Sequence, residues 1–259
     1  MWYKTFPWKD FDWNSDPYQP LIPLKSNKLL KKYEHLFFDL DHTLWDFERN
    51  SQETIYELFT ALQLGKLIPS AADVYTSFKE INRFLWDEYH LDKISKEALR
   101  KRRFEMVLEQ NGVRDESLAE EFSDLYLERC PQKSYLIPHT IEILDYLKDR
   151  YMLHVLSNGF EETTKQKLAS SALGTYFKTV CTPSHSGYKK PDSEMFLFAM
   201  QMANATVSNS LMIGDDLQAD ILGAKKCGIS QVYFNPEQKK HEHLLSYEIK
   251  SILELKELL

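Results

Sequence analysis

The chain has 259 residues, of which 43% are hydrophobic, so it can form one large domain or two modest ones with a full core. Its 39 acidic and 32 basic side chains give a net charge of −7, which argues against a broad contact surface for nucleic acid or anionic lipid. The three cysteines, Cys130, Cys181 and Cys227, are far apart, so neither a disulfide framework nor a zinc site is indicated. We find no apolar run of the roughly 18 to 20 residues that span a membrane and no signal-peptide pattern, and we expect a cytoplasmic protein.

Residues 1–33 differ from everything that follows. Aromatic residues such as Trp2, Trp8 and Trp13 alternate with prolines such as Pro7 and Pro17. Dense aromatic residues rarely stay fully solvated, while the prolines oppose a long helix or a central strand. We therefore expect an N-terminal arm that packs on the protein body or on a second copy, or else a poorly ordered tail.

The stretch from His35 to Thr43 combines an apolar run with two carboxylates. Leu36, Phe37 and Phe38 are typical of a strand covered on both faces, and Asp39 and Asp41 follow directly. Because side chains alternate along extended backbone, both carboxylates leave on the same side. Two such charges repel each other unless a cation lies between them or one group keeps its proton. An isolated Asp-x-Asp pair is weak evidence, since many such pairs are solvated turns or caps.

Residues 51–135 show apolar residues at helical spacing and contain only Gly65 and Gly112 as glycines. We expect an inserted all-helical segment of four helices, with ends near Gly65, Leu91 and Gly112. Some of its side chains could contact a substrate, although the core and surface of a small bundle would account for most of them: Asn82, Trp86, Tyr89, Arg103 and Phe104.

From Pro138 onward the pattern changes to helices alternating with strands. The expected elements are helices at 138–149, 161–172, 192–204 and 217–226, and strands at 152–156, 177–181, 211–213 and 231–234. This alternation predicts an α/β fold with a Rossmann-like parallel sheet flanked by helices, formed by residues 34–50 and 136–259. After Pro236 we expect a solvated loop and a last helix over 249–259.

Three further polar groups follow the predicted strands. Ser157-Asn158-Gly159 offers a hydroxyl and backbone amides, as an oxyanion site does, although serine is also a common helix cap. Lys190-Pro191-Asp192 precedes a helix, where proline is ordinary and the lysine could be any surface lysine. Gly214-Asp215-Asp216, with Asp220 one helical turn later, is the stronger signal because an apolar strand again ends in paired carboxylates.

These groups belong at one edge of one sheet, where ligands of open α/β sheets bind. Acidic oxygens, one hydroxyl and one lysine suit Mg²⁺ and a phosphoryl group, because Mg²⁺ prefers oxygen ligands and cations stabilise phosphoryl transfer. The sequence alone therefore favours magnesium-dependent phosphoryl chemistry on a small molecule.

The ordered set of motifs resembles the haloacid dehalogenase-like hydrolase superfamily over residues 34–259. The motifs are Asp39-Leu-Asp41-His-Thr43, Ser157, Lys190-Pro191 and Gly214-Asp215-Asp216-x3-Asp220. The runs F-F-D-L-D-H-T-L-W-D-F, N-R-F-L-W-D-E-Y and S-N-G-F resemble its pyrimidine 5'-nucleotidase branch more narrowly. Ser184-His185 stands where this pattern has an acidic pair, and the N-terminal arm is not part of the pattern.

The resemblance implies a role for each acidic motif residue. Asp39 would attack phosphorus and form an aspartyl-phosphate, and Asp41 would act as general acid and then general base. Asp39, Asp215 and the backbone carbonyl of Asp41 would hold Mg²⁺. Asp216 and Asp220 would either ligate the ion or hold its ligands in place.

The same resemblance assigns the remaining polar residues to the phosphate. Thr43, Ser157, Asn158 and Lys190 would bind its oxygens, and Lys190 would also neutralise Asp39. The helical insert would be a mobile cap that selects the leaving group, with Trp86, Tyr89 and Arg103 as candidate substrate contacts.

The resulting hypothesis is a phosphomonoester hydrolase, most specifically a 5'-nucleotidase for pyrimidine nucleoside monophosphates. A phosphoglycolate or sugar-phosphate phosphatase, or a mutase, remains open within the same superfamily. A haloacid dehalogenase is disfavoured because a metal-free site would gain only repulsion from Asp41 and Asp215. A catalytically silent binding protein is the remaining alternative. We expect a monomer or homodimer without nucleic-acid or membrane partners.

Overall fold

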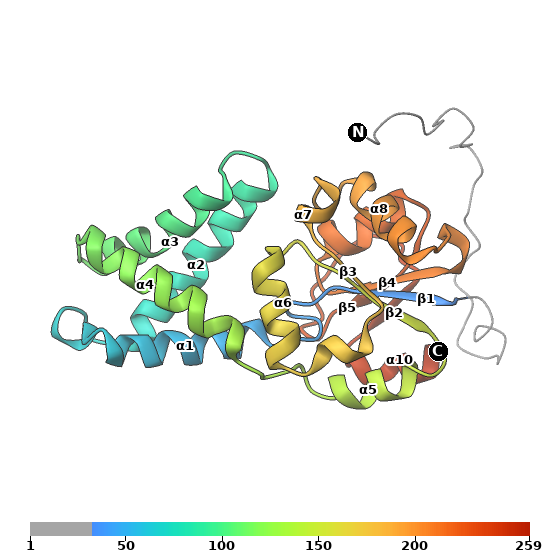
Figure 1. Ribbon diagram of the computed structural model, residues 1–259, viewed down its shortest axis with the longest axis horizontal. Coiled ribbons are helices and arrows are strands. Elements are labelled where there is room, and N and C mark those ends of the chain that lie inside the picture. The colour runs from blue at the N-terminus through green and yellow to red at the C-terminus, as the bar shows by residue number, and fades with distance from the viewer. Residues whose placement is uncertain (1–32) are drawn as a thin grey trace.

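The computed structural model describes residues 33–259, which form a sheet-containing body and a bundle of helices beside it (Figure 1). The predicted N-terminal arm, apart from Tyr33, lies outside the described residues. None of the helices in the described part combines the length and apolar character needed to cross a lipid bilayer.

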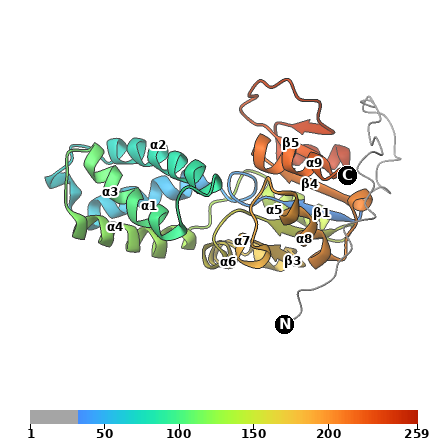
Figure 2. The same cartoon turned by 90° about the horizontal axis from the view of Figure 1, so that it is seen from above.

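The body is built on a six-stranded sheet in the order β3-β2-β1-β4-β5-β6, and every neighbouring pair is parallel (Figure 2). Its strands are β1 (His35–Phe38), β2 (Met152–Leu156), β3 (Thr179–Cys181), β4 (Ser210–Gly214), β5 (Ser230–Phe234) and β6 (Tyr247–Ile249). The predicted α/β fold with a parallel sheet is confirmed. Phe38 pairs with Val155 of β2 and Ile213 of β4, so the carboxyl ends of these three strands lie side by side.

Helices cover both faces of the sheet. Because side chains alternate along a strand, successive residues of β1 point into the two different cores that these helices form with the sheet. Leu36 and Phe38 belong to a core shared with α5 (Thr140–Leu147) and α10 (Leu255–Leu258). Phe37 belongs to a second core, shared with α8 (Ser193–Ala203) and α9 (Gly223–Lys226). The apolar run of β1 is therefore continuous because neither of its faces meets water.

Between β1 and β2, the first four helices form the bundle in Figure 1, and α5 follows them on the body. They are α1 (Phe47–Ala61), α2 (Ala71–His90), α3 (Lys96–Gln110) and α4 (Glu116–Arg129), with short 3₁₀ turns at Leu64–Lys66 and Cys130–Gln132. Ser70, Ser95 and Asp115 cap the last three by accepting backbone N–H bonds. Phe104 and Phe122 stack at the centre, with ring centroids 4.3 Å apart. The first helix begins four residues before the expected start at 51.

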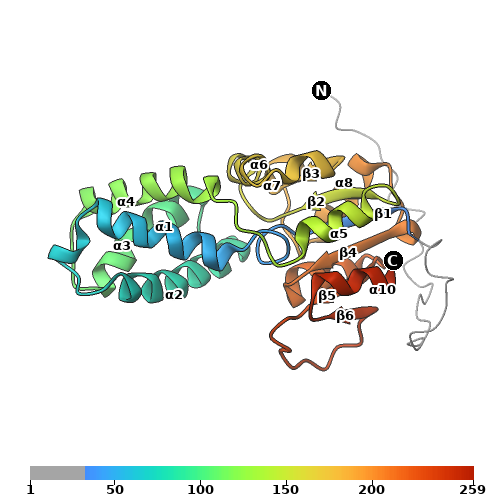
Figure 3. The same cartoon turned by 90° about the horizontal axis from the view of Figure 1, so that it is seen from below.

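The C-terminal region differs from the expectation of a loop followed by a helix over 249–259. Ile249 of β6 pairs with Phe234 of β5, so β6 is an edge strand beside β5 (Figure 3). Only Ile252–Glu254, a 3₁₀ turn, and α10 are helical after it. The prediction failed because three strand residues next to a charged loop are too few to show a period.

The remaining short elements lie around the same sheet. They are α6 (Glu161–Ser170), a 3₁₀ turn at Leu173–Tyr176, α7 (Pro183–Ser186), a 3₁₀ turn at Val207–Asn209 and a π-helix at Leu217–Leu222 that continues into α9. We did not expect α7. In it, His185 joins Thr182 in a capping box and lies 3.6 Å from Glu161, at the position where the family pattern has an acidic residue.

Candidate active site

Asp39 follows directly after the last residue of β1. Its backbone N–H still donates to the carbonyl of Ile213, 2.9 Å away, which continues the ladder toward β4. The residue is 8% exposed. Leu40 is fully buried on the opposite side, as alternation of side chains predicts. Asp39 is therefore held by rigid backbone at the carboxyl edge of the sheet.

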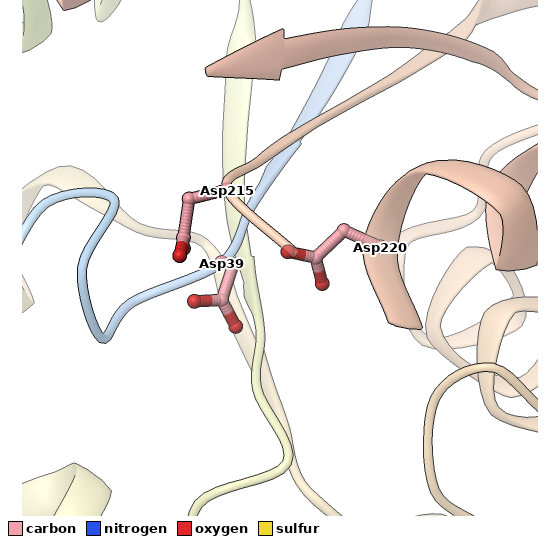
Figure 4. A group of neighbouring side chains, drawn as sticks. All are labelled: Asp39, Asp215 and Asp220. Carbon is pink, nitrogen blue, oxygen red and sulfur yellow. The ribbon is translucent and has the colours of Figure 1, made fainter. Parts of the chain in front are cut away.

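Two more carboxylates come from Asp215, directly after β4, and from Asp220 in the π-helix that follows (Figure 4). Thr43 donates from Oγ1 to Oδ1 of Asp215 at 2.8 Å, so the loop after β1 orients the acid after β4. Gly214 is required here, because a Cβ on it would overlap the carboxylate of Asp220. Asp220 accepts from the backbone N–H of Asp216 at 3.1 Å, which closes the turn.

Asp39, Asp215 and Asp220 each offer one oxygen, and among the residues the structure describes these three oxygens lie within 4.8 Å of one another. Burial raises the pKa of Asp39 and of Asp220, and burial together with the charge of Asp39 raises the pKa of Asp215 to about 7. The cluster carries more negative charge than the protein itself neutralises. A hard divalent cation such as Mg²⁺ fits this donor set of buried carboxylate oxygens.

Lys190 is the cation that the protein supplies to this cluster. Its Nζ lies 2.5 Å from Oδ1 of Asp39 and 2.6 Å from Oδ1 of Asp220, and it donates to the carbonyl of Leu156 at 2.7 Å. The residue is 2% exposed. Burial opposes its charge, but Asp220 and Asp39 outweigh that effect and raise the pKa of Lys190. The ammonium group stays charged across the physiological range.

Asn158 holds the backbone of Lys190 in place. Its Oδ1 accepts from the N–H of Lys190 at 2.8 Å, and its Nδ2 donates to the carbonyl of the same residue at 2.9 Å. The peptide bond between Lys190 and Pro191 is cis. Helix α8 begins at Ser193, so Pro191 precedes the helix and does not occupy its first position.

Asp41 faces a second lysine, Lys167 of α6. The ammonium contacts both carboxylate oxygens, at 2.6 and 2.8 Å, and lies 4.3 Å from the centre of the Trp45 ring. Our sequence reasoning missed Lys167. The signal was available, because Lys167 lies on one face of its helix with Thr164 and Leu168, the face that the structure buries.

The other predicted phosphate contacts lie around this centre. Ser157 is buried, and its Oγ accepts from the N–H of Gly159 at 3.0 Å. A Cβ on Gly159 would lie 2.8 Å from Oγ1 of Thr164, so the chain can pass here only as glycine. Because α6 begins at Glu161, Ser157 is not its cap. Asp216 caps the π-helix by accepting from the N–H groups of Gln218 and Ala219, and it does not join the carboxylate cluster.

A cavity of about 810 Å³ lies between the sheet edge and the four-helix bundle. Asp39, Asp215 and Lys190 line one end, and Trp86 and Arg103 line the bundle side. Tyr89 is not among the lining residues and packs instead against Trp86 and Phe160. The cavity also includes Phe160, which sequence reasoning did not single out.

The residues of the helical insert that were predicted to contact substrate lie in different surroundings, some at the cavity and others in the bundle core. Trp86 stacks on Phe160 with ring centroids 5.2 Å apart, which places an aromatic wall between bundle and body. Glu162 of α6 pairs with Lys96 and Arg100 of α3, at 2.5 and 2.6 Å, next to that wall. Phe104 lies inside the bundle core.

Comparison with known proteins gives a consistent assignment. A family model described as haloacid dehalogenase-like hydrolase matches residues 33–228. The pyrimidine 5'-nucleotidase PynA of Streptococcus pneumoniae is 31% identical over 228 residues, 86% of this chain and 93% of PynA. The pyrimidine 5'-nucleotidase YjjG of Escherichia coli is 26% identical over 234 residues, 88% of this chain and 98% of YjjG. The crystal structure of the HAD-hydrolase YfnB from Bacillus subtilis bound to magnesium matches with a TM-score of 0.78 at 26% identity, covering 87% of this chain and 97% of YfnB. The chain belongs to the haloacid dehalogenase-like hydrolase family.

Proposed function

We propose that this hydrolase is a magnesium-dependent phosphomonoesterase that acts through an aspartyl-phosphate, and that its substrates are pyrimidine nucleoside 5'-monophosphates. The observation that carries the proposal is the meeting of Asp39, Asp215 and Asp220 with Lys190 at the floor of one cavity. An excess of buried carboxylates together with a fixed ammonium group suits a phosphoryl group and a divalent cation.

The ion would be held by the carboxylates of Asp39 and Asp215, by that of Asp220 directly or through its neighbours, and by the backbone carbonyl of Asp41. When bound, it would offset the charge of these acids and of the phosphoryl oxygens. Lys190 also offsets the charge of Asp39, because its Nζ contacts Oδ1 of that residue.

Asp39 is the nucleophile in this proposal. One of its carboxylate oxygens forms a bond to phosphorus while the bond from phosphorus to the leaving oxygen breaks. The departing oxygen takes a proton from Asp41, which then accepts a proton from the water that attacks the aspartyl-phosphate. Inorganic phosphate leaves and Asp39 is restored. Lys167 holds Asp41 at the cavity, with both its carboxylate oxygens within 2.8 Å of Nζ.

The nucleotidase part of the proposal is supported by two features. PynA and YjjG, which this chain resembles over most of its length, are both pyrimidine 5'-nucleotidases. The aromatic wall of Trp86 and Phe160 offers a surface on which a nucleobase can stack.

The test is a substrate panel assayed for phosphate release with Mg²⁺ and again with EDTA. It contains pyrimidine and purine nucleoside monophosphates, phosphoglycolate, sugar phosphates and a haloacid, the last assayed for halide release. We expect hydrolysis only with Mg²⁺ and fastest on pyrimidine nucleotides. Equal rates on all phosphates would contradict the nucleotidase assignment, and halide release without metal would contradict the phosphatase assignment.

The oligomeric state and the cellular location stay predictions. A monomer or a homodimer is expected, and light scattering on the purified full chain would distinguish them. A cytoplasmic location is expected, and fractionation of the source cells would test it.

A further inference from the structure

Arg103 of α3 is a buried cation without an acidic partner among residues 33–259. The residue is 5% exposed and makes no ion pair within the described part of the chain. Its Nη1 donates to Oδ1 of Asn82 at 3.2 Å, while Nε and Nη2 find no hydrogen-bond acceptor. A buried charge without compensation is costly, so its presence inside the bundle needs a reason.

Aromatic rings surround the guanidinium and account for part of that compensation. Its central carbon lies 4.9 Å from the ring centre of Tyr126, 5.3 Å from that of Phe104 and 5.9 Å from that of Phe78. Such contacts favour a cation but accept no hydrogen bond as strong as those an oxygen accepts. Two donor nitrogens, Nε and Nη2, therefore remain without an acceptor.

The two donors without partners form one edge of the guanidinium. Nε and Nη2 carry N–H groups that point in parallel, which is the fork that arginine uses to hold two acceptor atoms at once. Nη1, on the other side, is held by Asn82. Arg103 and Asn82 both line the cavity that is also lined by Asp39 and Lys190.

We infer that the Nε–Nη2 edge of Arg103 is the specificity-determining contact for the leaving group, and that it binds a planar group with two neighbouring hydrogen-bond acceptors. The inference rests on the proposed phosphatase function, because the cavity is then the place of the leaving group. The two nitrogens are covered in the present arrangement. Binding therefore includes a turn of the side chain from the rings toward the cavity.

Two kinds of substrate carry such an acceptor pair. A carboxylate presents two coplanar oxygens, as in a phosphorylated sugar acid. Cytosine presents O2 beside N3, in the way that guanine presents O6 and N7 to arginine. Uracil has an N–H at position 3, so it lacks this pair of neighbouring acceptors and serves as the comparison. A carboxylate and the cytosine edge offer the same pair of acceptors to Arg103, and the experiment distinguishes a sugar acid from a nucleobase as the group that binds.

The experiment uses two matched substrate pairs and one substrate without the acceptor pair. The pairs are cytidine against uridine 5'-monophosphate and 6-phosphogluconate against glucose 6-phosphate, and phenyl phosphate is the fifth substrate. Values of KM and kcat are measured for the full chain and for Arg103→Lys, which keeps the charge but loses the fork. The matched control is Arg102→Lys, since Arg102 is exposed on the same helix and does not line the cavity.

We expect Arg103→Lys to raise KM at least tenfold for the acceptor-pair member of one pair. The KM of its matched partner and of phenyl phosphate should change by less than threefold, and Arg102→Lys should leave KM unchanged for all five substrates. The pair that responds identifies the source as a nucleobase or a carboxylate. Equal changes on all five substrates, or no change on any, would overturn the inference.

A second variant and a binding measurement separate this result from a folding defect. Asn82→Asp is nearly isosteric and places a carboxylate beside the guanidinium, so it should weaken binding of the same substrate and leave phenyl phosphate unaffected. Calorimetric titration of the substrates in EDTA reports binding without turnover. If none of the five phosphates is hydrolysed with Mg²⁺, the proposed function fails, while binding lost selectively in Arg103→Lys still supports the subsite. Binding unchanged by both variants contradicts it.

Discussion

Two buried charged regions in the described part of the chain are organised differently. At the sheet edge, Lys190 contacts two carboxylates at 2.5 and 2.6 Å, and Asp215 is held by a hydroxyl of the neighbouring loop. In the helical bundle, Arg103 has an amide oxygen and three aromatic rings around it, and two of its donors have no partner among the described residues. The first region is crowded with opposite charges, and the second contains an isolated one.

This difference indicates a division of labour. Chemistry that is the same for every substrate needs its charges fixed by rigid strands, because small displacements of a nucleophile cost rate. Selection of a leaving group needs donors that the substrate itself satisfies. The sheet edge is therefore expected to be complete apart from its cation and phosphate, whereas the bundle side is incomplete until a leaving group arrives.

The largest expected effect comes from Asp39→Asn. The amide keeps the shape of the side chain but cannot act as the nucleophile, so phosphate release should fall by about 10⁴-fold or more. Thermal unfolding of the variant, followed by circular dichroism, should remain cooperative. Activity near that of the wild type would break the assignment of the sheet edge as the chemical centre.

The second largest effect is expected for Lys190→Met. Its kcat should be lower by about 10²–10³-fold, because the charge on Asp39 and on phosphate is no longer offset. Single-turnover phosphate release at saturating Mg²⁺ measures this loss. Lys165→Met removes a lysine that pairs with Glu161 at the surface and is the control. A loss confined to KM would show that Lys190 only binds substrate and would weaken the contrast between the two regions.

His154 lies on β2 of the same sheet and is buried, but in contrast to the charged groups at the sheet edge it is neutral at pH 7. Burial lowers its pKa from 6.5 to about 4, and its ring nitrogens contact His35 and Thr179. The unfolded chain thus binds more protons than the folded one between these values, so stability is lost as pH falls below 6.5. From pH 7 to pH 5 we expect His154 to account for a loss of about 2 kcal/mol in the free energy of unfolding.

Urea denaturation at the two pH values tests this effect. His154→Phe removes the proton uptake, so the variant should lose less stability between pH 7 and pH 5 than the wild type. An identical loss in both proteins would show that other groups cause the pH dependence.

Thr43→Val is expected to have the smallest effect. It removes the hydrogen bond to Asp215 and should raise the Mg²⁺ concentration for half-maximal activity about tenfold, with little change at saturating metal. Thr54→Val, which removes a similarly buried hydroxyl bonded to the carbonyl of Asn50, is the control. Equal shifts in both variants would contradict a specific role for Thr43.

Much of the fold could be predicted because its signals are local. The apolar run before Asp39, the helical period of the insert and the alternation after Pro138 each follow from neighbours in sequence. The edge strand at Tyr247–Ile249 could not be predicted, because it depends on pairing with β5 and not on its own pattern. The short helix α7 could not be predicted because four residues are too few to show a period, whereas the helix expected over 217–226 is present as the π-helix at Leu217–Leu222 and α9.

The sequence by itself determined which residue types end each strand, and hence that Asp39, Asp215 and Lys190 belong to one edge of one sheet. Only the tertiary structure decided their pairings: Asp220 with Lys190, Asp41 with Lys167 and Arg103 with no acid in the described part of the chain. The periods of strands and helices are set by short-range sterics and apolar burial. Ion pairs join residues up to 151 positions apart, and their partners depend on how the elements pack together.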